Sequence, residues 1–304
     1  MKTLSLLVVT YNTGALIREC LQGIVQMPLN VEVIVVDNAS SDETAQIIAA
    51  EFPSIKLIVN EKNLGFGAAN NLGFKASSGA VIVLVNPDLI LTSEAVSTLM
   101  EYLEAHPDVG IVGPRTHDSD GTIALTARAP YTPFRILAKY WGLDRFVPSL
   151  VYGHYQTLAK NAVKAFDAAW LQGSCLAMRR EDYQQLSGFD EGFFLFAEDT
   201  DLCERALLLG KRIVYLPDAN VTHHGSTTVS RYPLIRVRNY HLSPLYYFRK
   251  RHRHSAVWFL KMVFILELTG KASMRWLKTR FRRDPINDAK MQAEWQVLND
   301  VWKY

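Results

Sequence analysis

The first hundred residues alternate short apolar runs with stretches in which apolar residues recur at helical spacing. The apolar runs predict parallel strands at Leu4 to Thr10, Val31 to Val36, about Ile55 to Val59, and Ala80 to Val85. Between the first two runs, apolar residues occupy one face of a predicted helix: Leu16, Ile17, Cys20, Leu21, Ile24 and Val25. A second helix is expected to begin near Asp42 or Glu43. This alternation is typical of a doubly wound α/β domain with a mostly parallel, Rossmann-like sheet.

The pattern is less regular from Val109 onward, where Pro, Gly and aromatic residues predict loops, and residues 127 to 160 predict no clear element. Ordered elements are expected again at Trp170 to Arg180, in a helix from about Asp199 to Leu209, and in a strand from Arg212 to Leu216. Beyond Arg236 the chain is basic, aromatic and predicted to be helical. We therefore expect an α/β domain at residues 1–235 and a basic, amphipathic helical extension at residues 236–304.

Charge is unevenly distributed along the chain. Residues 241 to 283 contain eleven Lys or Arg and one acid, Glu267, a local net charge of +10 within a total of +3. The remaining residues must then sum to −7. This asymmetry favours a mildly acidic catalytic body with a basic tail that meets an anionic partner.

Three cysteines, Cys20, Cys175 and Cys203, form no CxxC pair, so neither a disulfide framework nor a thiolate metal site is predicted, and a reducing cytosol is expected. The first residues lead directly into a strand pattern, so we expect no signal peptide. The apolar run from Ala256 to Leu268 is interrupted by Lys261 and Glu267 and is shorter than the ~20 residues of a spanning helix. We therefore expect no transmembrane helix.

Polar residues follow two of the predicted strands, where ligands bind in open α/β sheets. Asp37 could accept hydrogen bonds from a nucleobase or ribose, or serve only turn and cap chemistry with Ser40 and Ser41. Asn86 and Asp88, in Asn86-Pro87-Asp88, carry oxygen ligands of the kind that suit Mg²⁺ or Mn²⁺. The same tripeptide is also a good turn sequence.

Two further groups of ionisable residues lie later in the chain. Glu198, Asp199 and Asp201 stand at a predicted helix start, where capping accounts for at least one acid and another could be a general base. Spacing alone does not separate Glu198 from Asp199. The pair His223 and His224 is predicted to lie just past a strand and Pro217, where an imidazole could complete a metal's ligand set, contact a phosphate or simply face solvent.

Gly65-Phe66-Gly67-Ala68-Ala69-Asn70 is a near match to the dinucleotide-binding fingerprint, with Asn70 in place of the third glycine. This pattern keeps an NAD(P)-dependent oxidoreductase open as a rival function. It leaves the acids near Asp199 and the histidines without a role. A noncatalytic nucleotide- or nucleic-acid-binding protein is the second rival, with the basic tail as its working surface.

Taken together, the motifs resemble the family 2 glycosyltransferases, most of all the bacterial rhamnosyltransferases of cell-surface polysaccharide and O-antigen synthesis. The resemblance covers residues 4 to about 230 and rests on the order of Val8 to Asn12, Val35 to Asp42, Asn63 to Asn71, Asn86 to Asp88, Gly188 to Glu191, Glu198 to Leu202 and His223 to Gly225. It implies a GT-A fold and inverting transfer of a sugar, L-rhamnose from dTDP-rhamnose as the first choice and a UDP-hexose as the alternative. The implied acceptor is a lipid-linked saccharide.

The resemblance also implies roles for individual residues. Asp199 corresponds to the catalytic base, with Glu198 beside it, and Asp88 and His223 to contacts of a divalent metal cofactor, Mg²⁺ or Mn²⁺. Because the metal motif usually reads Asp-x-Asp and here begins with Asn86, Asp88 is expected to carry most of the metal contact. Donor and nucleotide contacts are expected at Thr10, Tyr11, Asn12, Asp37, Asn63, Gly65, Asn71 and Asn86.

The tail repeats aromatic and basic residues at Tyr246 to Arg251, Trp258 to Lys261 and Trp276 to Arg283. Such segments suit an anionic membrane surface, and we expect the protein to be peripheral on the inner, cytoplasmic face of the cell membrane. Nucleic acid is the competing anion and is not expected. A helix packed on the body, or on a second subunit in a homo-oligomer, is the remaining alternative.

Overall fold

The computed structural model describes residues 4–223, 231–281 and 285–304. The chain forms two compact units. The first comprises Met1–Pro130, Gly153–Glu191 and Glu198–Ser226, and the second comprises Tyr131–Tyr152, Gly192–Ala197 and Thr227–Tyr304. Two short segments that precede residue 236 are therefore grouped with the C-terminal helices.

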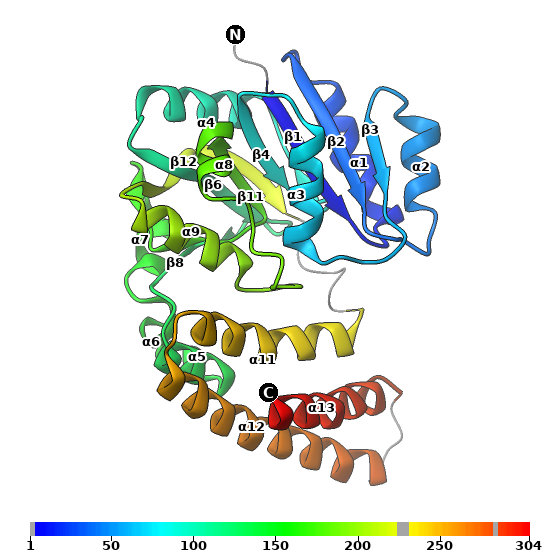
Figure 1. The fold of residues 1–304 in the computed structure, drawn as a ribbon, viewed down its shortest axis with the longest axis vertical. Helices are drawn as coiled ribbons and strands as arrows, with labels where there is room; N and C mark the ends of the chain where they lie inside the picture. The colour runs from blue at the N-terminus through cyan, green and yellow to red at the C-terminus, as the bar shows by residue number, and fades with distance from the viewer. Residues whose placement is uncertain (1–3, 224–230, 282–284) are drawn as a thin grey trace. The chain divides into compact units, whose positions relative to one another are not determined.

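The first unit contains a mixed sheet, with ten strands in the described part of the chain. Its main path runs β3 (Lys56–Val59), β2 (Val31–Asp37), β1 (Leu4–Thr10), β4 (Val81–Val85), β11 (Cys175–Arg179), β6 (Val109–Asp118), β12 (Arg212–His223) and β5 (Leu89–Ile90) (Figure 1). The first four strands are parallel, as are β6 and β12, whereas β11 is antiparallel to both of its neighbours. The predicted α/β class and the first four strands are confirmed within a residue or two.

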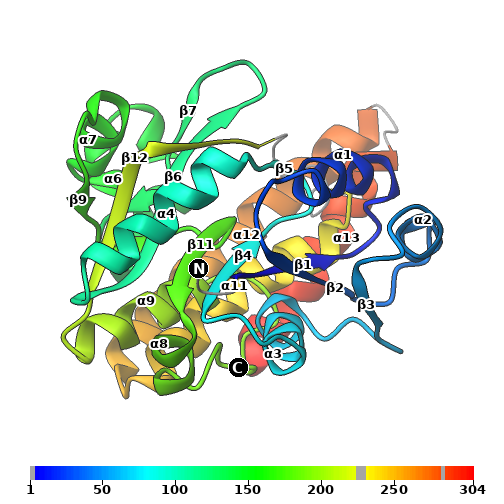
Figure 2. The ribbon, with the colours of Figure 1, turned by 90° about the horizontal axis from the view of Figure 1, so that it is seen from above.

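Helices cover both faces of this sheet (Figure 2). On one face, α1 (Gly14–Val25), α2 (Thr44–Glu51) and α4 (Ser93–Ala105) share a hydrophobic core with strand residues such as Leu6 and Val8. On the other, α3 (Phe66–Ala76), α8 (Arg180–Gln185) and α9 (Glu198–Leu208) share a second core with Leu7 and Val9. Because successive side chains of a strand point to opposite faces, a fully buried, mostly apolar strand such as β1 supplies both cores.

Two expectations about the second half of this unit are wrong. Val109 begins a buried central strand, β6, instead of a loop region. Strand β12 does not end at Leu216 but continues through Pro217 to His223, so His223 lies on a strand instead of in a loop. A register shift between Leu216 and Asn220 lets the strand pass the proline, which cannot donate a ladder hydrogen bond.

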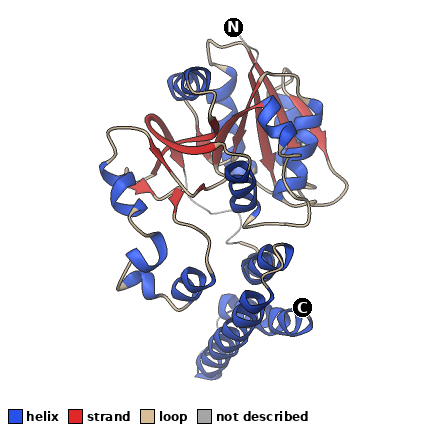
Figure 3. Cartoon of the chain, turned by 60° about the vertical axis from the view of Figure 1, so that its left-hand side comes forward, coloured by secondary structure: helices blue, strands red, loops and turns tan. Residues whose placement is uncertain are grey.

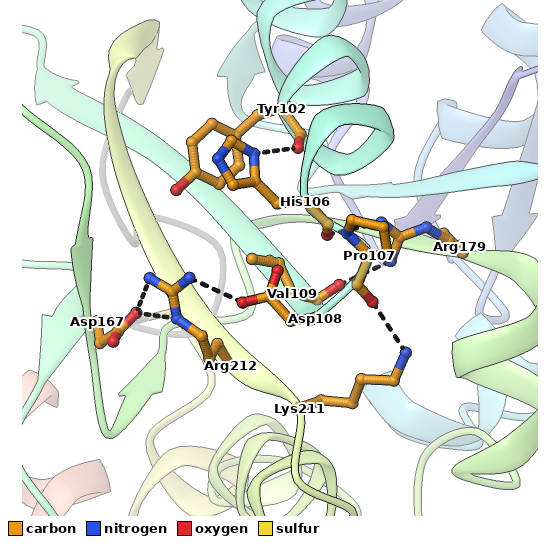
Figure 4. A network of polar contacts seen from close by, with 9 residues as sticks. All are labelled: Tyr102, His106, Pro107, Asp108, Val109, Asp167, Arg179, Lys211 and Arg212. Atoms are coloured by element: carbon orange, nitrogen blue, oxygen red, sulfur yellow. Dashed lines mark hydrogen bonds and ion pairs between the residues drawn. The ribbon is translucent and has the colours of Figure 1, made fainter.

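Smaller elements complete the first unit. Strand β7 (Ile123–Ala124) pairs with β6, β9 (Phe166–Asp167) pairs with β12, and β8 (Ala127–Arg128) forms a separate ribbon with β10 (Trp170–Leu171); α7 (Tyr155–Asn161) precedes β9. At the start of β12, Arg212 binds Asp108 at 2.9 Å and Asp167 at 2.8 Å (Figure 4). This network joins the amino-terminal ends of β6 and β12 to β9, at the opposite end of β12 from His223.

The second unit is helical, and the helices appear in blue in Figure 3. It contains α5 (Pro133–Tyr140), a 3₁₀ turn (Leu143–Arg145), α6 (Ser149–Tyr152), α11 (Pro233–Lys250), α12 (His254–Phe281) and α13 (Pro285–Lys303). The last three pack against one another around a core that includes Leu245, Phe248, Leu260, Phe264 and Val297. The helical C-terminal region is therefore confirmed. Among the described residues, no helix combines the length and apolar character needed to cross a bilayer.

Candidate active site

The ends of β1 and β2 lie side by side, with Thr10 paired in register with Asp37. Asp37 is completely buried, and its carboxylate accepts hydrogen bonds from the backbone N–H of Ser40 at 3.0 Å and from the Ser40 hydroxyl. Asn12, which has φ of 52°, ties the two following loops together: its Oδ1 accepts from the N–H of Ser41 at 2.7 Å. The predicted residues Thr10, Asn12 and Asp37 therefore meet at the carboxyl edge of the sheet.

Asn38 is a residue that the sequence reasoning did not single out, although it stands directly after Asp37. Its amide N–H₂ donates to Asn63 Oδ1 at 2.9 Å and to the Gly65 carbonyl at 3.0 Å, and its Oδ1 accepts from the Leu64 N–H at 2.9 Å. The side chain is buried. Asn38 thus holds Asn63 and Gly65, two predicted donor contacts, against the end of β2.

Asn71 has a different environment from the other predicted donor contacts. It donates to the Phe189 carbonyl and to Glu191, each at 2.9 Å, and accepts from the Tyr183 hydroxyl at 2.7 Å and the Phe189 N–H at 2.9 Å. These four contacts use both donors and both lone pairs of the amide. The side chain therefore holds the Gly188 to Glu191 turn, and its amide has no capacity left for a donor substrate.

The glycine-rich segment also has a structural explanation. Gly65, with φ of 87°, precedes α3, which follows the edge strand β3 and not the first strand of the sheet. A Cβ at Gly67 would lie 2.9 Å from Phe189 Cβ. The glycine thus permits close packing of α3 on the Phe189 turn, and the segment is not placed as a dinucleotide fingerprint requires.

Asp88 and His223 are 135 positions apart in the chain, and the fold brings them together. Asp88 follows β4 and directly precedes β5, and β5 pairs with the end of β12 so that Leu89 lies opposite His223. His223 Nε2 lies 3.0 Å from Asp88 Oδ1, and both side chains are buried. Asn86 lies close by in sequence, with its N–H bonded to the Ser174 carbonyl at 2.9 Å. His224 lies outside the described residues.

This pair is the part of the described chain that best fits a metal. No group of three or more His, Cys, Asp or Glu in the described residues is placed to hold an ion. Mg²⁺ and similar hard cations are usually held by one or two side chains, with water and substrate phosphates filling the remaining positions. A buried carboxylate facing an imidazole at a strand edge fits that kind of site, in which a bound diphosphate would supply further oxygens.

Glu198 and Asp199 open helix α9, directly after two non-glycine residues with positive φ, Phe196 at 67° and Ala197 at 66°. Such backbone conformations cost about 1–3 kcal/mol each and are concentrated at functional sites. At the start of a helix the macrodipole favours negative charge. Two adjacent carboxyls therefore stand at the start of α9, directly after a strained turn.

The two carboxyls have different surroundings. Glu198 is 5% exposed, and its Oε2 atom has no hydrogen-bond partner. Burial and the neighbouring Asp199 carboxylate raise the pKa of Glu198 well above its usual range. The neutral acid is therefore the favoured form of Glu198.

Asp199, by contrast, is supplied with donors. Its Oδ2 accepts from the Gly173 N–H at 2.9 Å and its Oδ1 from the Thr200 N–H at 2.7 Å. Burial raises the pKa of Asp199, while these N–H groups and the positive charge of Arg128 oppose that rise. Of the two acids, Asp199 is thus the one that ionises more readily, because Glu198 lacks such donors. Gly173 and Arg128 were missed from the sequence because they reach Asp199 only through the fold, whereas Thr200 is the next residue in the chain.

The mixed, mostly parallel sheet, with an antiparallel β11 between β4 and β6 and helices on both faces, has the GT-A fold of glycosyltransferases. The chain belongs to glycosyl transferase family 2, whose model matches residues 5–186. It is 28% identical over 266 residues to the N-acetylglucosaminyl-diphospho-decaprenol L-rhamnosyltransferase of Mycobacterium tuberculosis, covering 82% of this chain and 85% of that protein.

Two further comparisons agree with this assignment. The chain is 25% identical to rhamnosyltransferase WbbL of Escherichia coli over 170 residues, or 53% of this chain and 61% of that protein. In fold it is similar to the mannosyltransferase PcManGT from Pyrobaculum calidifontis in complex with GDP-Man and Mn²⁺, with a TM-score of 0.52, 17% identity and coverage of 98% of this chain and 86% of that one.

Proposed function

We propose that this enzyme transfers L-rhamnose from dTDP-rhamnose to a lipid-linked saccharide during synthesis of a cell-surface polysaccharide, with inversion at the anomeric carbon. The similarity to an L-rhamnosyltransferase along most of both chains supports the sugar and the lipid-linked acceptor. A UDP-hexose is the alternative donor. Because the acceptor lipid resides in a membrane, the enzyme would work at the cytoplasmic membrane surface.

The observation that carries the catalytic proposal is the environment of Asp199. Its carboxylate is held by the Gly173 and Thr200 N–H groups beside a neutral Glu198. Asp199 accepts the proton of the acceptor hydroxyl while that oxygen attacks the anomeric carbon and the bond to the diphosphate breaks. One base acting on one face gives inversion, and the leaving diphosphate needs no proton from a second acid.

Asp88 and His223 would hold a divalent cation, Mg²⁺ or Mn²⁺, between the strand ends. A bound cation would neutralise charge on the departing diphosphate. The nucleotide part of the donor would be bound by Asp37 and by Asn63 and Gly65, which Asn38 holds in place. Thr10, Tyr11, Asn12 and Asn86 would contribute further contacts.

Donor choice is tested by supplying dTDP-rhamnose and, separately, UDP-glucose and UDP-N-acetylglucosamine to the purified chain with Mn²⁺ and a short polyprenyl-diphospho-N-acetylglucosamine. We expect a product with dTDP-rhamnose, with the anomeric configuration opposite to that of the donor. Transfer from a UDP-hexose alone would replace rhamnose with the alternative donor, and retained configuration would refute the single displacement.

The base is tested with Asp199→Asn. We expect transfer to fall by about 10²–10⁴-fold, the contribution typical of a general base, while calorimetric binding of dTDP with Mn²⁺ is preserved. Asp201→Asn is the matched control, since Asp201 lies on the same helix and pairs with Arg205 at 2.8 Å. Wild-type turnover of Asp199→Asn would remove this residue from the base role.

A further inference from the structure

Helix α12 presents an apolar face to solvent. Of its 28 residues, Trp258, Met262, Leu266 and Met274 have exposed fractions of 66%, 55%, 60% and 58%. The spacing of four residues between the first three places them on one side of the helix. Three more exposed apolar side chains extend the patch: Phe259, Trp276 and Leu277. We call these seven residues the α12 face.

The α12 face is long and contains no exposed acid. From Trp258 to Leu277 it spans about 28 Å at 1.5 Å per residue. The only acid of the helix, Glu267, is turned inward, where its carboxylate lies 2.9 Å from His241 Nε2 and also pairs with Lys271. The polar residues along the exposed side are small and uncharged, Thr269 and Ser273.

Cations flank the same helix. Lys261 lies 5.3 Å from the centre of the Trp258 ring, and Lys278 is exposed. Lys271 is half-exposed and pairs with Glu267, and Arg275 is held by Glu294 at 3.0 Å. Tryptophan at both ends of an apolar stripe, with lysines beside it, is the composition of a helix that lies in the plane of a membrane interface.

The packing also buries one aromatic part of the tail, which is therefore not available to a partner. The aromatic cluster at Tyr246 to Phe248 looked equally suitable in the sequence, but Tyr247 and Phe248 are buried in the core of the second unit. Arg251 lies 3.7 Å from the centre of the Tyr247 ring and Arg253 lies 5.4 Å from that of Phe248. This cluster therefore stabilises the helices, and the surface available to a partner is on α12. Arg282 and Arg283 lie outside the described residues.

We propose that the α12 face docks on the anionic surface of a lipid bilayer, with its apolar side chains among the upper acyl chains and its lysines at the headgroups. Charge complementarity selects this occupant, because the face joins apolar side chains to cations without an exposed acid. The inference rests on the proposed function, since a lipid-linked acceptor is presented at such a surface. Docking would place the enzyme where its acceptor is confined.

The test is flotation of the full chain with vesicles of phosphatidylcholine alone and of phosphatidylcholine mixed with phosphatidylglycerol, without acceptor. Leu266→Glu puts a charge in the middle of the face, and Leu208→Glu is the matched control, since Leu208 is an exposed leucine at the end of helix α9 in the first unit. We expect wild type and Leu208→Glu to float with the anionic vesicles. Vesicle binding by Leu266→Glu should be weaker by about tenfold or more, because the variant loses a leucine side chain that docking would bury in the bilayer.

The proposal would be overturned if the wild type did not float, or if both variants floated equally. It would also be overturned if the wild type bound no vesicles and light scattering showed a dimer that Leu266→Glu converts to a monomer. That last result would assign the face to a second copy of the chain. Donor hydrolysis and transfer to a short, water-soluble acceptor, measured on the same proteins, separate this proposal from the proposed function. If the protein transfers sugar but does not float with vesicles, only the docking proposal is refuted. If it floats but does not transfer sugar, only the catalytic proposal is refuted.

Discussion

Glu198→Gln distinguishes the two adjacent acids at the start of α9. Glu198 is 5% exposed, and burial and Asp199 raise its pKa well above the usual range, so we expect it to be a neutral acid in the folded protein. Glutamine has the same shape and no charge. Replacing a neutral acid by a neutral amide should therefore leave kcat/KM near pH 7 within about threefold, because no base is removed. If Glu198 were the base, the loss would be about 10²–10⁴-fold, or roughly 3–5 kcal/mol of transition-state stabilisation.

The same substitution has a predicted effect on stability with a definite sign. Because the folded protein keeps the Glu198 proton above pH ~4.3, where the unfolded chain releases it, the folded state binds more protons and wild-type stability falls as pH rises. Glu198→Gln abolishes this dependence. Above pH ~4.3, the difference in free energy of unfolding between the variant and the wild type should increase in favour of the variant. The increase should be up to about 1.4 kcal/mol per pH unit, until the pH reaches the pKa of Glu198 in the folded protein.

Both effects are measured on one pair of proteins, by pH profiles of kcat/KM and by urea unfolding at a series of pH values. A variant whose turnover collapses near pH 7 would show that Glu198 acts as the base. A stability difference that does not change with pH would show that Glu198 is ionised in the folded protein.

Three further substitutions test other parts of the site. Arg128→Gln removes a charge that lowers the pKa of Asp199, so the acidic limb of the kcat/KM profile should move to higher pH, and an unmoved limb would contradict the interaction. Asp88→Ala removes the carboxylate that faces His223, so dTDP binding in calorimetry should lose its dependence on Mn²⁺; a dependence like that of wild type would place the cation elsewhere. Gly67→Ala would put a Cβ 2.9 Å from Phe189 Cβ, and overpacking should lower the free energy of unfolding by about 1–3 kcal/mol. Unfolding at the wild-type urea concentration would show that the Phe189 turn gives way without strain.

The local sequence pattern was enough to predict the elements whose apolar residues form a continuous buried surface. The strands β1, β2 and β4 consist mostly of Val, Leu and Ile and are flanked on both faces by helices, and such runs are recognisable without the partners that cover them. The helix at α9 and the helical tail were also predicted, because their periodicity is local. Residues 127 to 160 gave no such signal, since their elements are two to eight residues long and depend on their neighbours for stability.

In the candidate site, too, some features follow from the local sequence and others only from the fold. The strand-end positions of Asp37 and Asp88 and the helix-start position of Asp199 could be predicted from the sequence, whereas their long-range partners could not. Asp88 meets His223 only because β5 pairs with an extended β12. Asp199 differs from Glu198 largely because Gly173 and Arg128, which are distant in the chain, lie beside it in the fold. In the tail, composition alone did not separate the buried Tyr247 from the exposed Trp258. The sequence by itself determined the fold class and the kinds of side chain available for chemistry; tertiary packing decided which of them are buried, charged or exposed, because burial and hydrogen bonding depend on neighbours that are distant in the chain.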